Sequence, residues 1–234
     1  MRRLRCTLSA MSTAARPYTL YGAPGSGATP VQAALTLIGA PVDIVDVAPW
    51  KGESERQKLA PLNPQRQAPV LVLPSGEVMT ESAAILLWLG DRHPEAGLAP
   101  AADHPLRAQY LRWMIYIPAA IYSMYWVRDL PSRLAADAAA EAVVLERSAE
   151  RIAECWRLMD AQLPRGTPYL LGDSLGLLDL YVTVVSRWTP RRLRFYREAP
   201  HMAEVVRRVD ADPRLQAFWA ARFPFTPGWE GAEA

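Results

Sequence analysis

The chain has 234 residues, 50% of them apolar and 21% charged, with 26 Lys and Arg residues against 24 Asp and Glu residues. This length fits one large domain or two small ones, the composition excludes intrinsic disorder for most of the chain, and a net charge of +2 gives no field that favours nucleic acid or an anionic membrane. The two cysteines, Cys6 and Cys155, can form neither a disulfide framework nor a cysteine-based zinc site, and no apolar run reaches the ~18 residues of a membrane-spanning helix.

The first elements along the chain predict a small α/β domain over residues 18–93, after an arginine-containing start at 1–17 that we expect to be disordered. A β-type run at 18–21 is followed by a helix, for which Thr29 is the expected N-cap in a capping box with Gln32, and which Gly39 ends. The next elements are an alternating strand at 41–47, a short helix around 53–59, a hairpin of strands 69–73 and 77–79, and a helix over 81–93.

This order, β-α-β-α-β-β-α, predicts a thioredoxin-like arrangement. The first two strands, joined by a helix, should be parallel, and the hairpin strands antiparallel. Redox proteins of this arrangement carry a CxxC motif where the first helix starts, but here the loop reads Gly25-Ser-Gly-Ala28. Disulfide chemistry is therefore excluded at this loop.

The second half of the chain predicts an all-α domain over residues 105–225, behind a linker at 94–104 and before a tail at 226–234. A long helix with a break at Pro118 should run to about residue 129, and a second apolar face covers 145–163. Residues 177–188 are apolar nearly all round, which predicts a central buried helix, and Pro200 and Asp212-Pro213 each open a shorter helix. We expect five or six helices.

Four motifs in this order and spacing resemble the soluble glutathione S-transferases over about residues 18–225. They are Tyr18-Thr-Leu-Tyr-Gly-Ala-Pro-Gly-Ser26, Asn63-Pro-Gln-Arg-Gln-Ala-Pro-Val70, Thr80-Glu-Ser-Ala-Ala-Ile85 and Gly172-Asp-Ser-Leu-Gly-Leu-Leu-Asp179. The resemblance implies a thioredoxin-like domain followed by a helical domain. A fold does not fix an activity, so each motif needs its own physical argument.

The resemblance implies that Glu81 and Ser82 hold the charged groups of the glutathione γ-glutamyl unit. Both residues lie where a hairpin ends and a helix begins, and the free N–H groups of a helix start attract anions. The alternative is that the two residues only cap the helix.

Ala68-Pro69 precedes a buried strand, where a proline cannot donate to the ladder. The resemblance implies a cis bond here, which leaves the Ala68 backbone free to pair with the cysteinyl backbone of glutathione. Gln67 stands where relatives often have a basic residue, so the glycine carboxylate of glutathione is expected near Gln67, Lys51 or Arg66.

Ser26 matches the activating serine of serine-type classes, which hydrogen-bonds the glutathione sulfur as a thiolate. Lowering a thiol pKa by two units requires ~2.7 kcal/mol. One hydrogen bond to a charged acceptor supplies ~1.5–3 kcal/mol and a helix N-terminus adds ~0.3–1 kcal/mol, so no general base is needed. The alternatives are that Ser26 is only a turn residue, or that Thr29 or Tyr21 contacts the sulfur.

The first long helix of the second domain is expected to line the electrophile pocket with Tyr110, Trp113, Met114 and Ile117, and Tyr116 is a further candidate. A stripe at helical spacing can equally be core, which is the competing interpretation. Asp179 is expected to cap the buried helix. Arg191, Arg192, Arg194 and Arg197 are expected to form a solvated face, and the alternative is a site for an anionic substrate or a partner.

The resemblance implies a cytoplasmic, homodimeric glutathione transferase that uses glutathione as co-substrate, needs no metal, acts on small hydrophobic electrophiles in detoxification, and binds neither nucleic acid nor membrane. Two alternatives stay open. One is an isomerase, dehalogenase or peroxidase of the same fold that uses glutathione as cofactor. The other is a glutathione-binding protein with little catalysis.

Overall fold

The structure is a computed structural model that describes residues 16–225, so most of the start expected to be disordered, with Cys6, and the expected tail at 226–234 lie outside the described residues. Its N-terminal part consists of β1(Tyr18–Gly22), α1(Ala28–Ile38), β2(Val42–Asp46), the 3-10 turn η1(Pro49–Lys51), α2(Glu53–Leu59), β3(Val70–Val72), β4(Val78–Thr80) and α3(Ser82–Arg92). The four strands form one sheet in the order β2-β1-β3-β4.

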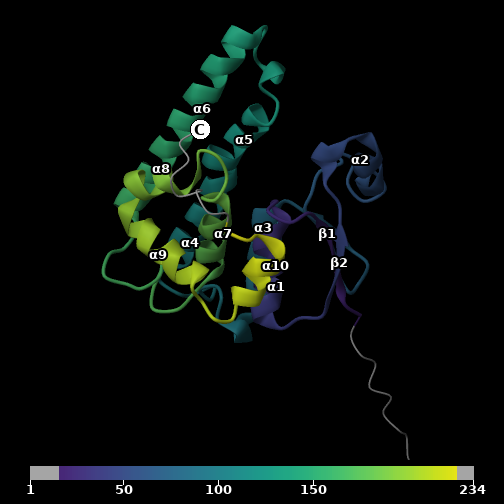
Figure 1. Ribbon diagram of the computed structural model, residues 1–234. Helices are drawn as coiled ribbons and strands as arrows, with labels where there is room; N and C mark the ends of the chain where they lie inside the picture. Colours follow the sequence, from purple (N-terminus) through teal and green to yellow (C-terminus); the bar gives the residue numbers. More distant parts are fainter. Residues whose placement is uncertain (1–15, 226–234) are drawn as a thin grey trace, which may run out of the picture.

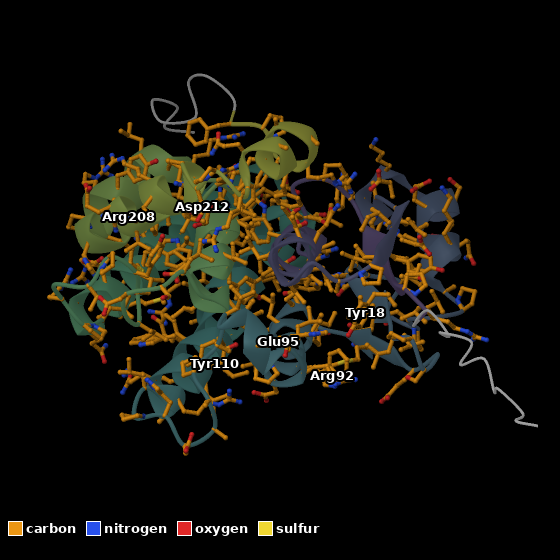
Figure 2. All side chains as sticks on the ribbon, turned by 90° about the horizontal axis from the view of Figure 1, so that it is seen from below. Tyr18, Arg92, Glu95, Tyr110, Arg208 and Asp212 are labelled. Atoms are coloured by element: carbon orange, nitrogen blue, oxygen red, sulfur yellow. The ribbon has the colours of Figure 1, made fainter. Side chains whose placement is uncertain are left out.

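The strand pairing confirms the predicted thioredoxin-like arrangement. β1 is parallel to β2, with Leu20 opposite Ile44, whereas β3 is antiparallel to both β1 and β4. Helix α1 ends at Gly39, whose left-handed φ of 73° lets its N–H reach the carbonyl oxygens of Leu35 and Thr36. At the other end of the domain, the Tyr18 hydroxyl lies 2.9 Å from His93 Nε2 and so links the start of β1 to the end of α3; Figure 2 labels Tyr18 and Arg92 there.

The named elements of the second part of the chain are all helical, as predicted. After a short turn, η2(Pro94–Ala96), it consists of α4(Arg107–Tyr116), a π-helical segment η3(Ile117–Tyr122), α5(Ser123–Arg128), the 3-10 turn η4(Pro131–Arg133), α6(Ala138–Gln162), α7(Leu177–Val185), α8(Arg191–Glu198), α9(Pro200–Asp210) and α10(Gln216–Arg222). The predicted break at Pro118 is a π-helical segment rather than a gap, because a wider turn accommodates a residue that lacks an N–H. Helix α8 was not predicted.

Helix α7 is the centre of the molecule, and every one of its residues is buried. Its start is held by Asp179, whose carboxylate accepts the N–H of Gly176 at 2.7 Å and that of Leu170 at 2.9 Å. This confirms the predicted capping role of Asp179. The linker also packs here, since the Leu177 N–H donates to the carbonyl oxygen of Leu98 at 2.8 Å.

One continuous hydrophobic core joins the two domains. Helix α1 packs against α7 and α10, and Figure 1 shows α10 beside α1. Arg222 on α10 donates to Gln32 Oε1 at 2.9 Å and forms an ion pair with Asp46. The helical domain therefore fixes the position of α1 and of the loop that leads into it.

Candidate active site

The loop between β1 and α1 is folded by Ser26, which is 8% exposed. The Ser26 hydroxyl donates to the carbonyl oxygen of Ala23 at 2.6 Å, and its oxygen accepts the N–H groups of Ala23 and Ala28 at 3.2 Å each. The hydroxyl proton is thus used within the loop, and the hydroxyl oxygen satisfies an N–H group at the start of α1.

The expectation that Thr29 caps α1 is wrong. The helix begins at Ala28, its N-cap is Gly27, and no side chain caps it. Thr29 lies buried in the first turn, with its N–H bonded to the Ser26 carbonyl oxygen at 2.9 Å. The physical reason is that Ser26 supplies acceptors to the first N–H groups, so the helix can start before the predicted cap.

The helical domain holds this loop from the outside. Trp188, which follows α7, donates its indole N–H to the carbonyl oxygen of Gly25 at 2.7 Å. Gly25 has a left-handed φ of +74°, and a Cβ there would lie 3.1 Å from the Phe223 ring. Arg187 in turn donates a hydrogen bond to the Phe223 carbonyl oxygen. Trp188 therefore fixes the loop directly, and its neighbour Arg187 fixes it through Phe223.

Tyr122 brings a second hydroxyl to the loop. A Cβ on Gly27 would lie 2.7 Å from the Tyr122 phenol oxygen and 3.4 Å from Cδ of Pro69. The phenol makes no hydrogen bond with the residues that the structure describes, and its ring packs edge-on against Trp188 with centroids 4.8 Å apart. Burial raises the pKa of Tyr122 well above its usual range, so the phenol stays protonated.

The Ala68–Pro69 peptide bond is cis, as the resemblance implies. Between residues 16 and 225, neither the N–H nor the C=O of Ala68 takes part in a hydrogen bond. The segment before it is held by Asn63, whose side chain donates to the Gln67 carbonyl oxygen at 2.9 Å and accepts the Gln65 N–H at 3.0 Å. A backbone donor and acceptor thus stand free next to the loop.

The residues expected near the glycine carboxylate differ in their surroundings. Arg66 forms an ion pair with Glu53 through Nη1 at 2.6 Å. The side chains of Gln67 and Lys51 are exposed and form no hydrogen bond within the described part of the chain. Gln67 and Lys51 therefore have side-chain polar atoms free to contact a ligand, whereas Arg66 is already paired with Glu53 through one nitrogen.

Glu81 and Ser82 lie at the start of α3, as predicted. Glu81 is exposed with a left-handed φ of 64°, a conformation that costs about 1–3 kcal/mol in a residue other than glycine and is typical of ligand-binding positions. Ser82 is buried, and its Oγ lies 2.9 Å from the hydroxyl of Tyr181 on α7. No side chain caps α3, so its first N–H groups can bind an anion.

Tyr110, Trp113, Met114 and Ile117 lie in the hydrophobic core, each with at most 1% of its surface exposed. Figure 2 shows Tyr110 on the helical side of the molecule. These positions agree with the competing interpretation, in which the apolar stripe is part of the core and not the lining of a pocket. Tyr116 is half-buried and donates its hydroxyl to the Cys155 carbonyl oxygen at 3.3 Å, and Tyr21 packs in a small cluster with Val47 and Leu59.

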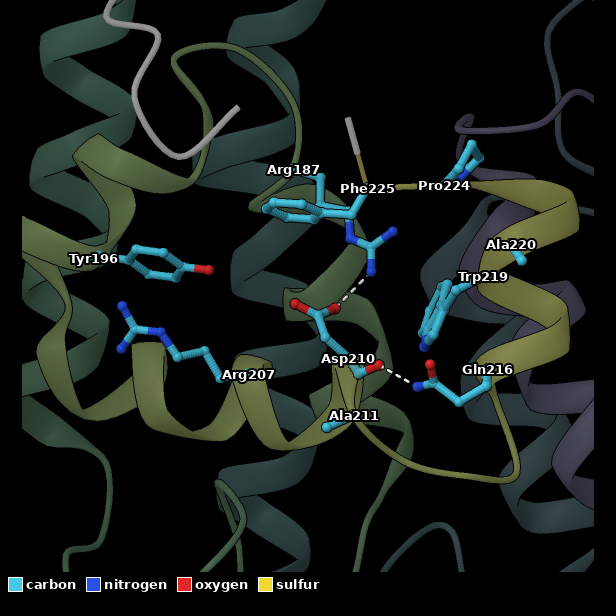
Figure 3. A pocket seen from close by; sticks show the side chains of 10 residues that line it. All are labelled: Arg187, Tyr196, Arg207, Asp210, Ala211, Gln216, Trp219, Ala220, Pro224 and Phe225. Carbon is cyan, nitrogen blue, oxygen red and sulfur yellow. Dashed lines mark hydrogen bonds and ion pairs between the residues drawn. The ribbon is translucent and has the colours of Figure 1, made fainter. Parts of the chain in front are cut away.

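The expectation that the arginines at 191–197 form only a solvated face is wrong for Arg192. Arg187 and Arg192 have exposed fractions of 1% and 0%, and both form ion pairs with Asp210, at 2.6 Å and 2.9 Å. Figure 3 shows Arg187 and Asp210 at the wall of a cavity of about 580 Å³, with Arg207, Trp219 and Phe225. Because one carboxylate serves both buried guanidiniums, the cluster stabilises the junction of α7, α8 and α9.

None of the described helices has the length and apolar character that crossing a membrane requires. Within residues 16–225, no three His, Cys, Asp or Glu side chains come together as a possible metal site.

Comparison with known proteins agrees with this architecture. Residues 20–97 match the family model for the glutathione S-transferase N-terminal domain. The chain is 33% identical over 198 residues to the uncharacterized GST-like protein YncG of Escherichia coli K12, a match that covers 84% of this chain and 94% of that protein.

Two solved structures are similar in fold. A glutathione transferase homologue from Sulfitobacter with bound glutathione has a TM-score of 0.76 at 24% identity, with 88% of this chain and 98% of that chain covered. A sphingomonad glutathione S-transferase complexed with glutathione has a TM-score of 0.70 at 24% identity, with 87% and 98% covered. The family model, the relative of near-complete coverage and the shared fold together show that the chain belongs to the glutathione S-transferase family.

Proposed function

We propose that the protein is a glutathione transferase, which binds glutathione and activates its thiol for attack on small apolar electrophiles. The observation that carries this proposal is the unpaired backbone of Ala68 beside cis Pro69, next to the start of α1. The glutathione found in the Sulfitobacter and sphingomonad structures supports the same ligand.

The proposed ligand contacts follow from the free polar groups around the loop. The Ala68 N–H and C=O would pair with the cysteinyl backbone of glutathione. Ser82 and the start of α3 would receive the γ-glutamyl carboxylate, and Glu81 its ammonium group. Gln67 and Lys51 are the proposed contacts for the glycine carboxylate.

The proposed reaction begins with the glutathione thiol releasing its proton to water. A sulfur lone pair then forms a C–S bond to the electrophilic carbon, and the leaving group departs with the electron pair of its own bond. Within the loop, Ser26 is the residue that the family resemblance places at the sulfur, but contact with the sulfur would require its hydroxyl to leave the Ala23 carbonyl oxygen. The electrophile is proposed to lie beside the partly exposed Tyr122 and Trp188, which pack against the hydrophobic core that contains Tyr110, Trp113, Met114 and Ile117.

A thermal-shift titration with glutathione tests the binding step, with S-methylglutathione as the control that lacks a free thiol. Aryl halides, epoxides and peroxides then test the reaction class. Conjugation of aryl halides or epoxides supports the proposal, whereas turnover only with peroxides identifies a peroxidase of the same fold. Binding without any turnover favours a glutathione-binding protein. Absence of binding overturns the proposal.

A homodimer in the cytoplasm is the proposed state of the protein, by analogy with its family. Light scattering on the purified chain tests the dimer.

A further inference from the structure

We propose that the hydrogen bond to the glutathione sulfur comes from the Tyr122 hydroxyl of the helical domain, and that Ser26 shapes the loop instead. This inference rests on the proposed function and names a residue that carries it out. It follows from how the two hydroxyls next to the loop are used.

The Ser26 hydroxyl is fully engaged. It donates its only proton to the Ala23 carbonyl oxygen at 2.6 Å, and its oxygen accepts two backbone N–H groups. Turning that proton toward a ligand would break the shortest of these three bonds and leave the buried Ala23 carbonyl oxygen with only the longer bond of 3.1 Å from the Ser26 N–H. The serine is therefore a poor donor to a sulfur atom.

The Tyr122 hydroxyl, in contrast, is free to donate a hydrogen bond to a ligand. No residue between 16 and 225 forms a hydrogen bond with it. The phenol oxygen lies 2.7 Å from the point where a side chain on Gly27 would begin, and Pro69 Cδ lies 3.4 Å from that same point. The phenol, the start of α1 and the cis proline thus meet at one spot.

Gly27 is what allows this approach. Its φ of −59° is an ordinary helical value, so the backbone does not demand a glycine there. A Cβ at this position would instead collide with the phenol oxygen. The chain therefore lacks a side chain at the loop position that the Tyr122 hydroxyl reaches from the other domain.

The surroundings of Tyr122 hold the phenol in place and keep it protonated. Trp188 packs edge-on against the ring and is itself bonded to the loop through Gly25. The charged or titratable groups that act on the phenol are Tyr181 on α7, Asp129 after α5 and Glu81 before α3, and all three oppose its ionisation. A protonated phenol can donate a hydrogen bond to a thiolate and cannot act as a base at neutral pH.

The test compares Tyr122→Phe with the wild-type protein by following the ultraviolet absorbance of the bound thiolate from about pH 5 to about pH 9. Loss of one hydrogen bond to a charged sulfur should raise the apparent pKa of bound glutathione by about one pH unit or more. Conjugation near pH 6 should fall about tenfold and recover at high pH. Glutathione affinity near pH 6, where most of the bound glutathione is still the thiol, should stay within about twofold.

Tyr125→Phe is the matched control. Tyr125 belongs to the same aromatic group, with its ring centroid 5.1 Å from that of Trp188, but it does not approach Gly27. This variant should bind and titrate glutathione as the wild type does. The proposal is overturned if the pKa of the bound thiol is unchanged in Tyr122→Phe. It is also overturned if Ser26→Ala is the only one of these variants that raises this pKa.

Gly27→Ala provides an independent variant in which Tyr122 is intact. Its methyl group should displace the phenol oxygen and raise the bound-thiol pKa in the same direction. In the Tyr122→Phe background the same methyl group meets no phenol oxygen, so its additional effect should be small. If the effects of Gly27→Ala and Tyr122→Phe on the thiol pKa are additive, the methyl group does not act through the Tyr122 hydroxyl.

The outcomes also separate this inference from the proposed function. If the wild-type protein binds no glutathione, the proposed function itself fails. If it binds glutathione and Tyr122→Phe leaves the thiol pKa unchanged, only this inference fails.

Discussion

The indole N–H of Trp188 donates a hydrogen bond of 2.7 Å to the carbonyl oxygen of Gly25, 163 residues earlier in the chain. This bond joins the helical domain to the loop at which the glutathione sulfur is expected. The same indole packs against Tyr122 and Tyr125 at 4.8 Å and 5.1 Å. Trp188 therefore positions two parts of the site at once: the loop and the tyrosine that faces it.

Trp188→Phe should keep an aromatic ring beside Tyr122 and Tyr125, and remove the donor to Gly25 together with the packing of one of the two indole rings. We expect a loss of at least about 1–2 kcal/mol in the free energy of unfolding, because the Gly25 carbonyl oxygen is left without its partner. Urea denaturation measures this loss. Trp50→Phe is the control, since Trp50 is 61% exposed and its replacement should change stability by less than about 0.5 kcal/mol. Equal effects of the two substitutions would show that the indole bond contributes nothing to stability.

Asp210→Ala should be one of the most destabilising single substitutions in the helical domain. Arg187 and Arg192 are both buried and share this carboxylate, so its removal leaves two uncompensated guanidiniums in the interior. Figure 3 shows the pair of Arg187 with Asp210. Breaking a buried pair in this way costs about 3–5 kcal/mol.

Glu204→Ala is the matched control for Asp210→Ala, because the Glu204–Arg207 ion pair is exposed on the surface of the same helix. Its loss should cost less than about 1 kcal/mol. Thermal unfolding of the two variants compares them directly. A small effect of Asp210→Ala would mean that water reaches the two arginines.

Ser82→Ala and Tyr181→Phe separate ligand binding from the contact between the domains. Both variants remove the 2.9 Å hydrogen bond between the two hydroxyls. Only Ser82→Ala also removes the proposed donor to the γ-glutamyl carboxylate. We therefore expect glutathione affinity, measured by calorimetry, to fall about tenfold in Ser82→Ala, the loss of one hydrogen bond to a charged group, and to stay close to wild type in Tyr181→Phe. A similar loss in both variants would assign Ser82 to the domain contact alone.

The buried carboxyl group of Asp179 makes the stability of the folded protein depend on pH in a defined direction. Its burial raises its pKa from 3.8 to about 7, against the opposing effect of the backbone N–H groups of Leu170 and Gly176. Between pH 3.8 and about pH 7, Asp179 is protonated in the folded protein but has released its proton in the unfolded chain. The contribution of Asp179 to stability is therefore full below the unfolded pKa and is lost as the pH rises through about 7.

Asp179→Asn isolates this contribution, because the amide stays neutral at every pH. The amide nitrogen cannot accept an N–H, so the variant should be less stable than wild type by about 1–3 kcal/mol near pH 5. That difference should shrink toward pH 8, since only the wild-type protein loses stability over this interval. Urea denaturation at several pH values measures it, and a difference that grows with pH would contradict the raised pKa.

Local sequence signals determined most of the fold. The spacing of the apolar residues predicted the strands, the α/β order and the buried α7. Prolines at element starts and Gly39 at a helix end predicted where elements begin and end. All of these signals act within a few residues of the chain. The same local rules failed at Thr29, where a residue of the preceding loop, Ser26, already satisfies the helix start.

The tertiary structure decided which side chains meet at the site. Nothing in the spacing of the sequence relates Gly27 to Tyr122, Gly25 to Trp188 or Ser82 to Tyr181, because each pair is joined only when the helical domain packs on the thioredoxin-like domain. For the same reason the sequence could not tell that Tyr110 and Trp113 point into the core, or that Arg192 is buried beside Asp210. Composition and charge excluded whole classes of function, whereas the assignment of a hydroxyl to the glutathione sulfur depends on contacts between segments about a hundred residues apart.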